Sequence, residues 1–239
     1  MYTGKNNRSA HTVTIRKCYN SIVMKKPELN RVETLFENRY VNVYDLSYKD
    51  GQHYYDASRR KKEDLVAVQE RPDLPDAVSA FVILKCKDNE ERLLLFHEYR
   101  YPTGQYVLSI PSGLIDPDDK KTDDPVRSAV IRELKEETGL IINEGDTLKE
   151  VNHFVFCTPG LSDESTALVA AHIDLDEQQH LTQNGAEGTE IFDGFRLVTR
   201  KEAQQLLQKG TDDSGIPYPL VTWAAMMYFL HDTESDLLR

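Results

Sequence analysis

The chain has 239 residues, of which 39% are hydrophobic and 29% are charged, a composition typical of a soluble globular protein rather than a disordered or fibrous one. Its 29 basic and 40 acidic residues give a formal net charge of −11, which argues against nucleic-acid binding because phosphate contacts need clusters of Lys and Arg. No apolar run of about 18 residues predicts a membrane span, and the polar residues 1–10 do not resemble a signal peptide, so we expect a cytoplasmic protein.

The first predicted elements form a small antiparallel β segment. Residues 40–47 alternate between apolar and polar side chains, the polar turn KDGQ follows, and residues 53–57 can return as the second strand of a hairpin. The charged stretch 59–75 is typical of a connection. We therefore assign residues 1–70 to a β-rich N-terminal segment and residues 71–239 to the main domain.

The main domain is predicted to contain several strands and three helices. Strands are expected at residues 77–86, 92–99, 106–110, 149–156, 166–173 and 192–198. Helices are expected at residues 125–138, 201–209 and 219–231. The last helix is apolar on nearly all sides, which indicates a place in the core or at a subunit contact.

The three cysteines, Cys18, Cys86 and Cys157, lie far apart and form no CxxC motif. This spacing predicts neither disulfides nor a thiolate metal site, and we expect buried structural thiols.

The helix at residues 125–138 has clear end signals. Asp124 is a suitable N-cap, and Pro125 fits the first helical position because its missing N–H has no partner there. Gly139 fits the left-handed position that follows a last helical turn.

Three glutamates near the end of this helix, Glu133, Glu136 and Glu137, are spaced i, i+3 and i+4 and project from one face. A projection at about 100° per residue places Glu133 and Glu137 on the same side as the apolar Val126 and Val130. Like charges on a core-facing side need compensation, since they raise each other's pKa and desolvation adds to the cost. A divalent cation provides it, and all-oxygen ligation favours Mg²⁺ or Mn²⁺.

Arg132 lies one turn before Glu136, at the spacing of an i, i+4 ion pair. Its planar guanidinium is suited to orienting a ligand carboxylate, so we expect it to set the geometry of the site rather than to add stability.

Residues 132–140, RELKEETGL, match the second half of the Nudix box, G-x5-E-x7-R-E-U-x-E-E-x-G-U, at every fixed position. Gly113 supplies the first glycine, but the arginine of the box follows it by 19 positions where the pattern has 14. Five residues, which we place at 118–122, therefore look inserted, and Asp119 or Asp124 stands nearest to the first glutamate of the box. On these residues the chain is identified as a member of the Nudix hydrolase superfamily.

Within this superfamily, the chain resembles ADP-ribose pyrophosphatases from about Tyr40 onward. Three segments carry the resemblance: HEYRYP at 97–102 is similar to Q-x-R-P, PSGLID at 111–116 to P-A-G-L-I-D, and TPGLSDE at 158–164 to S-P-G-x-S/T-D/N-E. The resemblance implies an α/β (α+β) fold, with an α/β/α sandwich around a mixed sheet and a small N-terminal antiparallel β segment. It also implies a homodimer in which the N-terminal segment reaches the other subunit.

The resemblance further implies roles for single residues. The metal ligands would be Glu133, Glu136, Glu137 and the backbone carbonyl of Ser112. Arg100 would contact the diphosphate. The segment YDASRR at 55–60 resembles W-E-x-x-x-R, which holds adenine, so Tyr55 would stack on the base with Arg60 beside it; a structural hairpin tyrosine fits Tyr55 equally well.

The resemblance also implies a late catalytic carboxylate in the loop before the strand at 192–198. The sequence NGAEGTE offers Glu187 and Glu190, and the distance to that strand favours Glu190, although an acidic solvated loop is the alternative. Ser109 stands where many of these enzymes carry Glu, which could alter a ribose or phosphate contact.

The expected reaction is Mg²⁺-dependent hydrolysis of a nucleoside diphosphate derivative, with ADP-ribose giving AMP and ribose 5-phosphate. Catalysis would depend on Glu137, Arg132 and Glu190, or Glu187 in place of the last. One alternative is a pyrophosphatase for UDP-glucose or NADH, and another is a non-catalytic sensor that binds ADP-ribose. The intact box glutamates, and the lack of a basic cluster after residue 198, argue against a sensor.

Overall fold

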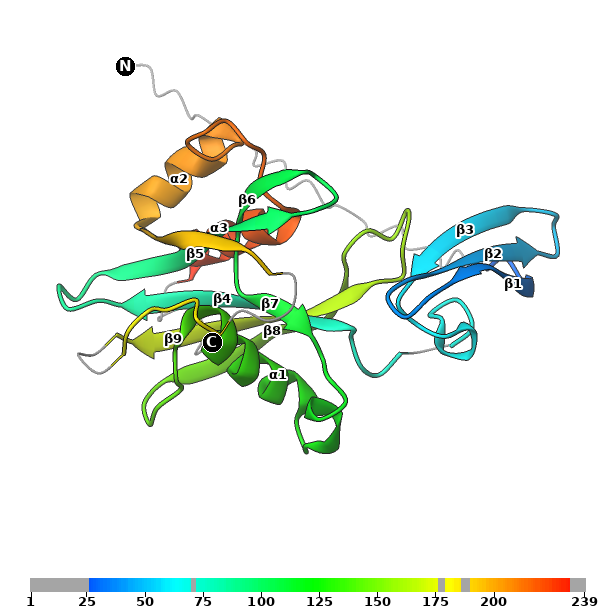
Figure 1. Ribbon diagram of the computed structural model, residues 1–239, viewed down its shortest axis with the longest axis horizontal. Coiled ribbons are helices and arrows are strands. Elements are labelled where there is room, and N and C mark those ends of the chain that lie inside the picture. Colours follow the sequence, from blue (N-terminus) through cyan, green and yellow to red (C-terminus); the bar gives the residue numbers. More distant parts are fainter. Residues whose placement is uncertain (1–25, 70–71, 176–178, 186–189, 233–239) are drawn as a thin grey trace, which may run out of the picture.

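The computed structural model describes residues 26–69, 72–175, 179–185 and 190–232. Within them the main body is built on a seven-stranded mixed sheet (Figure 1). Its strands are, in spatial order, β10 (Phe192–Val198), β5 (Glu91–Arg100), β4 (Ala77–Lys85), β9 (Ser165–Asp174) and β8 (Thr147–Phe156), with β6 (Gln105–Ser109) paired to β5 and β7 (Ser112–Leu114) paired to β4. β4 and β9 run parallel, whereas the other neighbours are antiparallel.

Helices cover both faces of this sheet, so the predicted α/β/α sandwich with a mixed sheet is confirmed (Figure 1). They are α1 (Pro125–Glu133), α2 (Arg200–Lys209) and α3 (Leu220–His231). On one face α1 buries Val126 and Val130 against alternate residues of β4, and on the other face α3 buries Met226 and Phe229. β4 is an almost continuous apolar run because helices lie on both sides of it.

The apolar helix α3 belongs to the core along one side only. Ala225, Met226 and Phe229 are buried, whereas Leu220 and Trp223 remain exposed. Among the helices that the structure describes, none has both the length and the apolar character needed to cross a membrane.

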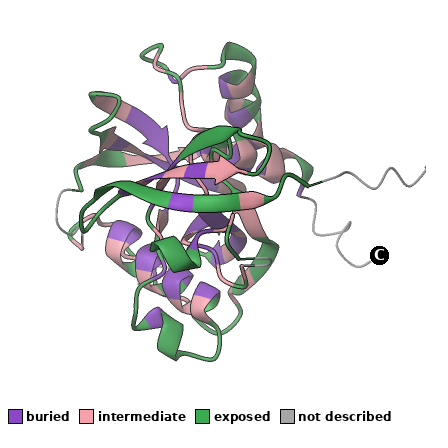
Figure 2. Ribbon diagram, turned by 90° about the vertical axis from the view of Figure 1, so that its right-hand side faces the viewer, coloured by how far each residue is buried: buried purple, intermediate pink, exposed green. Residues whose placement is uncertain are grey.

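A separate three-stranded antiparallel sheet forms the N-terminal part, where a small antiparallel β segment with two strands was predicted. It contains β1 (Leu29–Glu37), β2 (Asn42–Tyr48) and β3 (His53–Ser58). Val32, Tyr44, Leu46 and Leu65 make a small core beneath it, while much of the sheet is exposed (Figure 2). β1 was not predicted, because all but two of its nine side chains are exposed and carry no apolar alternation.

The two sheets are joined by polar contacts with the segment between β8 and β9. The Tyr54 hydroxyl donates to the carbonyl of Gly160 at 2.7 Å, and the backbone N–H of Ala57 donates to the carbonyl of Leu161 at 3.1 Å. The Arg59 guanidinium pairs with Glu164 at 2.7 Å. These contacts place the N-terminal sheet beside residues 160–164.

Two further differences concern short elements. β7 was not predicted, because three residues around a glycine carry no strand pattern. Cys86 and Cys157 are free and partly buried, whereas Cys18 lies outside the described residues.

Candidate active site

The helix that carries the glutamates changes type near its end. Its start is as predicted, since the Asp124 carboxylate accepts a hydrogen bond from the backbone N–H of Arg127 at 3.0 Å. The predicted helix over residues 125–138 is confirmed in extent, but its last turn differs in type: α1 ends at Glu133 and Leu134–Thr138 forms a π-helix. Gly139 then closes the helix with φ +73°, as expected. A π turn is wider than an α turn and often occurs at functional sites.

Two of the three glutamates are buried at this helix end. Glu137 is 3% exposed and its Oε2 accepts a hydrogen bond from the backbone N–H of Ser112 at 2.9 Å. Burial raises the pKa of Glu137 well above its usual value, and the charge of Glu133 raises it further. Burial also raises the pKa of Glu133 to about 7, against an opposing effect of Arg132. Glu136 is only partly buried.

Gly113 makes room for one of these carboxylates. A Cβ atom built on Gly113 would lie 1.8 Å from Oε1 of Glu133 and 2.1 Å from its Cδ. Any larger residue would collide with the carboxylate, which explains why the chain has glycine here although its φ is not positive.

Arg132 links the glutamates to the loop before the helix. Its Nη1 donates to Oε1 of Glu133 at 2.7 Å and to Oε2 of Glu136 at 2.9 Å, so the predicted i, i+4 ion pair is confirmed. Its Nη2 donates to the carbonyl of Leu114 at 2.7 Å and to Oδ2 of Asp119 at 3.0 Å. The guanidinium therefore fixes two carboxylates relative to β7.

Asp119, one of the two acids considered for the first glutamate of the box, pairs with Arg132. It is buried and also accepts hydrogen bonds from the Ser128 hydroxyl and the Asp116 backbone. Burial alone would raise its pKa, but the hydrogen bonds, that from Arg132 foremost, lower it. Asp119 thus contacts the arginine of the box, whereas Asp124 caps the helix, and the placement of the inserted residues at 118–122 stays a prediction.

Glu190 lies near the helix carboxylates. Its charge contributes to the raised pKa values of Glu98, Glu133 and Glu137, so its carboxylate is within electrostatic reach of all three. Glu187 lies outside the described residues.

Sequence reasoning passed over Glu98, which the structure brings into the same group. Its side chain is buried at the end of β5 and pairs with Nη2 of Arg100 at 2.8 Å. Burial raises its pKa, which Arg100 and Ser109 lower in part. An available signal was the alternation of β5, which places Glu98 on the same face as the apolar Leu94.

The two residues proposed for base recognition have different surroundings. Tyr55 is 60% exposed on β3. The Arg60 side chain is 13% exposed, and its Nη2 donates to Oδ2 of Asp76 at 3.0 Å and to the Ser165 hydroxyl at 3.2 Å. These contacts join the N-terminal sheet to the main body, and none of the described contacts of Arg60 involves Tyr55.

The carboxylates fit a divalent cation by the chemistry of their donor atoms. Arg132 uses one oxygen each of Glu133 and Glu136, and Ser112 uses one oxygen of Glu137, so a second oxygen remains on each carboxylate. Mg²⁺ and Mn²⁺ prefer such oxygen donors. Over the described ranges no three acidic, His or Cys side chains surround one point, and Glu133 and Glu136 are both paired with the Arg132 guanidinium.

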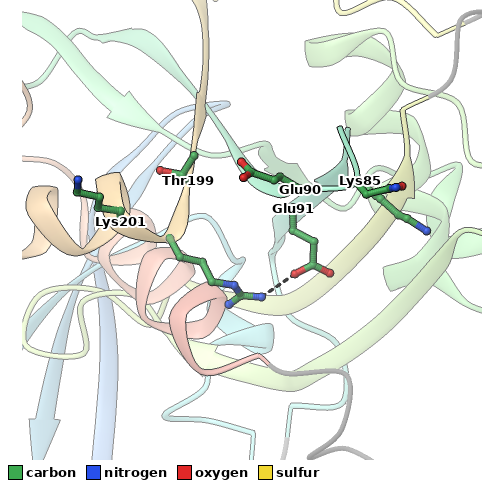
Figure 3. A pocket seen from close by; sticks show the side chains of 7 residues that line it. Lys85, Glu90, Glu91, Thr199 and Lys201 are labelled. Atoms are coloured by element: carbon green, nitrogen blue, oxygen red, sulfur yellow. Dashed lines mark hydrogen bonds and ion pairs between the residues drawn. The ribbon is translucent and has the colours of Figure 1, made fainter. Parts of the chain in front are cut away.

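An open cavity of about 520 Å³ lies at the other end of β5 (Figure 3). Lys85, Glu91, Thr199, Arg200 and Lys201 are among its lining residues, and Arg200 pairs with Glu91 at 2.6 Å. Strand geometry of about 3.3 Å per residue separates Glu91 from Glu98 by roughly 23 Å. The cavity is therefore distinct from the carboxylate group, and within its wall Arg200 is paired with Glu91.

Comparisons with known proteins agree with the motif. The family model described as NUDIX domain matches residues 74–220. The chain is 35% identical over 145 residues to a putative nudix hydrolase 2 of Caenorhabditis elegans, a match that covers 59% of each chain. It is 26% identical over 188 residues to an ADP-ribose pyrophosphatase of Saccharomyces cerevisiae, covering 76% of this chain and 74% of the yeast protein. An ADP compounds hydrolase NudE of Escherichia coli is 32% identical over 131 residues, which are 54% of this chain and 59% of the bacterial protein.

Proposed function

This chain belongs to the Nudix family, whose domain model matches more than half of it, and from this premise we propose that it hydrolyses ADP-ribose to AMP and ribose 5-phosphate. The observation that carries the proposal is the buried pair Glu133 and Glu137, held in place by Arg132, Gly113 and Ser112. Two relatives named for activity on ADP-linked compounds support adenine as the base.

Glu133, Glu136, Glu137 and the carbonyl of Ser112 would hold Mg²⁺ or Mn²⁺. When bound, such an ion supplies positive charge to the phosphoryl oxygens and lowers the pKa of a coordinated water. The buried carboxylates then no longer face one another uncompensated, which resolves the electrostatic cost seen in the raised pKa values of Glu133 and Glu137.

The remaining steps fall to this chain's own side chains. Glu190 accepts the proton of the attacking water, whose oxygen forms the new bond to phosphorus while the bridging P–O bond breaks toward the leaving phosphate. Arg100 neutralises charge on the diphosphate, and Arg132 fixes the directions of Glu133 and Glu136. The enzyme is a homodimer, and Tyr55 on the N-terminal sheet of one subunit stacks on the adenine bound to the other subunit. The enzyme acts in the cytoplasm.

The test is turnover of ADP-ribose by the wild type and Glu137→Gln, with AMP and ribose 5-phosphate identified as products. We expect kcat to fall at least about 100-fold in the variant, because the lost charge contributes to stabilising the transition state. Glu144→Gln, an exposed glutamate just beyond the same helix, is the matched control and should keep full activity. Equal rates for the wild type and Glu137→Gln, or full activity in excess chelator, would contradict the metal assignment.

A substrate panel with UDP-glucose and NADH decides between this reaction and its neighbours. If kcat/KM for UDP-glucose or NADH exceeds the value for ADP-ribose, that compound is the better substrate, and the protein remains a pyrophosphatase. Tight binding of ADP-ribose without hydrolysis of any compound would instead indicate the sensor.

A further inference from the structure

Glu98 lies on the face of the central sheet that α1 covers. Leu94 and Phe96 precede it by four and two residues on β5, so all three side chains point to the same side, and Leu94 packs in the core beneath α1. The Glu98 carboxylate therefore points toward the helix end that carries Glu137, whose raised pKa it also influences.

The described contacts give Glu98 one cationic partner. Its Oε2 lies 2.8 Å from Nη2 of Arg100, which is two residues further along β5 on the same face. The Glu98 side chain is 9% exposed and the Arg100 side chain 45% exposed. A buried, fixed carboxylate thus holds the end of a guanidinium that is open to solvent.

The pair is poorly explained as a device for stability. The buried charge of Glu98 pays a desolvation cost, and Glu190 and Glu137 lie close enough for like charges to interact. Replacing a buried ion pair by uncharged residues is often neutral or stabilising. A role of the buried Glu98 carboxylate in orienting Arg100 explains the ion pair better than a role in stability does.

Ser109 adds an independent observation on the neighbouring strand. Its hydroxyl is fully buried and forms no hydrogen bond of regular geometry, yet it lies near enough to Glu98 to lower the pKa of that carboxyl. β5 and β6 pair Phe96 with Ser109 and Glu98 with Val107, so Ser109 is diagonal to Glu98 on the same face. Glu98 is the only buried carboxylate in β5 and β6 as the structure describes them, because β6 contains no Asp or Glu.

We propose that Glu98 is a positioning residue which holds the Arg100 guanidinium in the orientation that receives the substrate's diphosphate, with Ser109 beside it. This inference rests on the proposed function and assigns to Glu98 a role in binding the substrate. An arginine side chain that is already ordered before the substrate binds loses less conformational entropy on binding, which favours affinity.

The Glu98→Gln variant removes the charge while keeping the shape of the side chain. We expect KM for ADP-ribose to rise about tenfold with kcat within threefold of wild type, because a contact made equally in ground and transition states affects KM alone. The melting temperature should stay the same or rise, since a buried charge is lost. A purely structural ion pair would instead lower the melting temperature and leave KM unchanged.

A double-mutant cycle with Arg100→Met tests whether Glu98 acts through Arg100. In the Arg100→Met background, Glu98→Gln should change KM less than twofold. Calorimetric binding of α,β-methylene ADP-ribose should show the same pattern of dissociation constants without turnover. A tenfold effect that persists in the Arg100→Met background, or a change in the Mg²⁺ concentration needed for half-maximal rate, would overturn the inference.

Glu91→Gln is the matched control, since it removes a Glu–Arg ion pair at the opposite end of the same strand. It should leave KM unchanged. If the wild type hydrolyses ADP-ribose, Glu137→Gln does not, and Glu98→Gln has wild-type KM, the role of Glu98 alone is overturned. If the wild type neither hydrolyses ADP-ribose nor binds the analogue, the proposed function fails and the role of Glu98 fails with it.

Discussion

At the scale of single residues, the site depends on how closely a carboxylate and a glycine approach. The Glu133 carboxylate occupies the space in which any side chain at position 113 would begin. Gly113 and Glu133, which are 20 positions apart in the sequence, are therefore packed so closely that no side-chain atom fits between them. The glycine of the box thus has a steric role that its spacing alone does not reveal.

We predict that Gly113→Ala reduces activity by displacing Glu133. The new methyl group would lie 1.8 Å from Oε1 of Glu133, so the carboxylate must turn away from its place beside Arg132. We expect kcat/KM to fall at least tenfold, with a loss of about 1 to 3 kcal/mol in unfolding free energy from overpacking. Steady-state kinetics and thermal unfolding measure the two effects.

Gly160→Ala is the control for this substitution. A Cβ atom on Gly160 meets nothing within 4 Å, and its φ is not positive. It should keep both activity and melting temperature. Wild-type activity in Gly113→Ala would show that Glu133 can leave this position without consequence.

Some of these residues could be predicted and others could not. The spacing of Glu133, Glu136 and Glu137 along one helix is a local property, and so is the pairing of Arg132 with Glu136. The position of Asp119 beside Arg132 depends on the path of a loop, and that of Glu98 on the pairing of two strands. The alternation of β5 indicates only the face of the sheet on which Glu98 lies, whereas the partners of Glu98 and Asp119 are decided by tertiary structure.

At the scale of elements, the π turn is packed against the loop that leads toward β10. The Thr182 backbone N–H donates to the carbonyl of Thr138 at 2.9 Å. A Cβ atom on Gly185 would lie 2.5 Å from the carbonyl oxygen of Glu136 and 2.9 Å from its Cα. Residues 182–185 are thus packed directly against the last turn of the helix, including the backbone of a proposed metal ligand, Glu136.

We predict that Gly185→Ala lowers kcat about tenfold or more while changing KM little. The added methyl group would collide with the backbone of Glu136, which cannot turn aside as a side chain can, so this proposed metal ligand must shift. Asn184→Ala, at the neighbouring exposed position, is the control and should retain kcat. Unchanged kcat in Gly185→Ala would show that this contact does not position Glu136.

The most deeply buried strands were predicted from their apolar runs, and the two strands that were missed carry weak sequence patterns. β4 and β9 bury nearly every side chain and carry clear apolar runs, whereas β1 is mostly exposed and β7 has only three residues. The π turn was missed because its hydrogen-bond pattern depends on what packs against Glu136 and Thr138. Local propensity does not distinguish it from a last α-helical turn.

At the scale of the whole molecule, two sheets are held together by charged and polar groups rather than by a shared apolar core. Arg60 donates to Asp76 and Ser165 of the main body. The backbone N–H of Asp163, in the segment before β9, donates to Oδ1 of Asp56 on β3 at 3.1 Å. The apolar clusters of the two parts are separate, so this junction sets how the N-terminal sheet sits.

The junction should make stability depend on pH through Asp56. Burial, and then the charge of Asp163, raise the pKa of Asp56 from 3.8 to about 6. A folded-state pKa above the unfolded value means that the folded protein binds the proton more tightly, so the contribution of Asp56 to stability falls as pH rises from about 4 to 6 and stays low at higher pH.

We predict that Asp56→Asn raises the melting temperature more at pH 7.5 than at pH 4.5. After allowance for solvent screening, the difference should be about 1 kcal/mol, or about 2 to 4 °C for a chain of this size. Thermal unfolding of both proteins at the two pH values measures it, with Asp50→Asn in the exposed turn of the same sheet as the control. An equal shift at both pH values, or a less stable Asn variant at pH 7.5, would show that the Asp56 charge is not a cost at this junction.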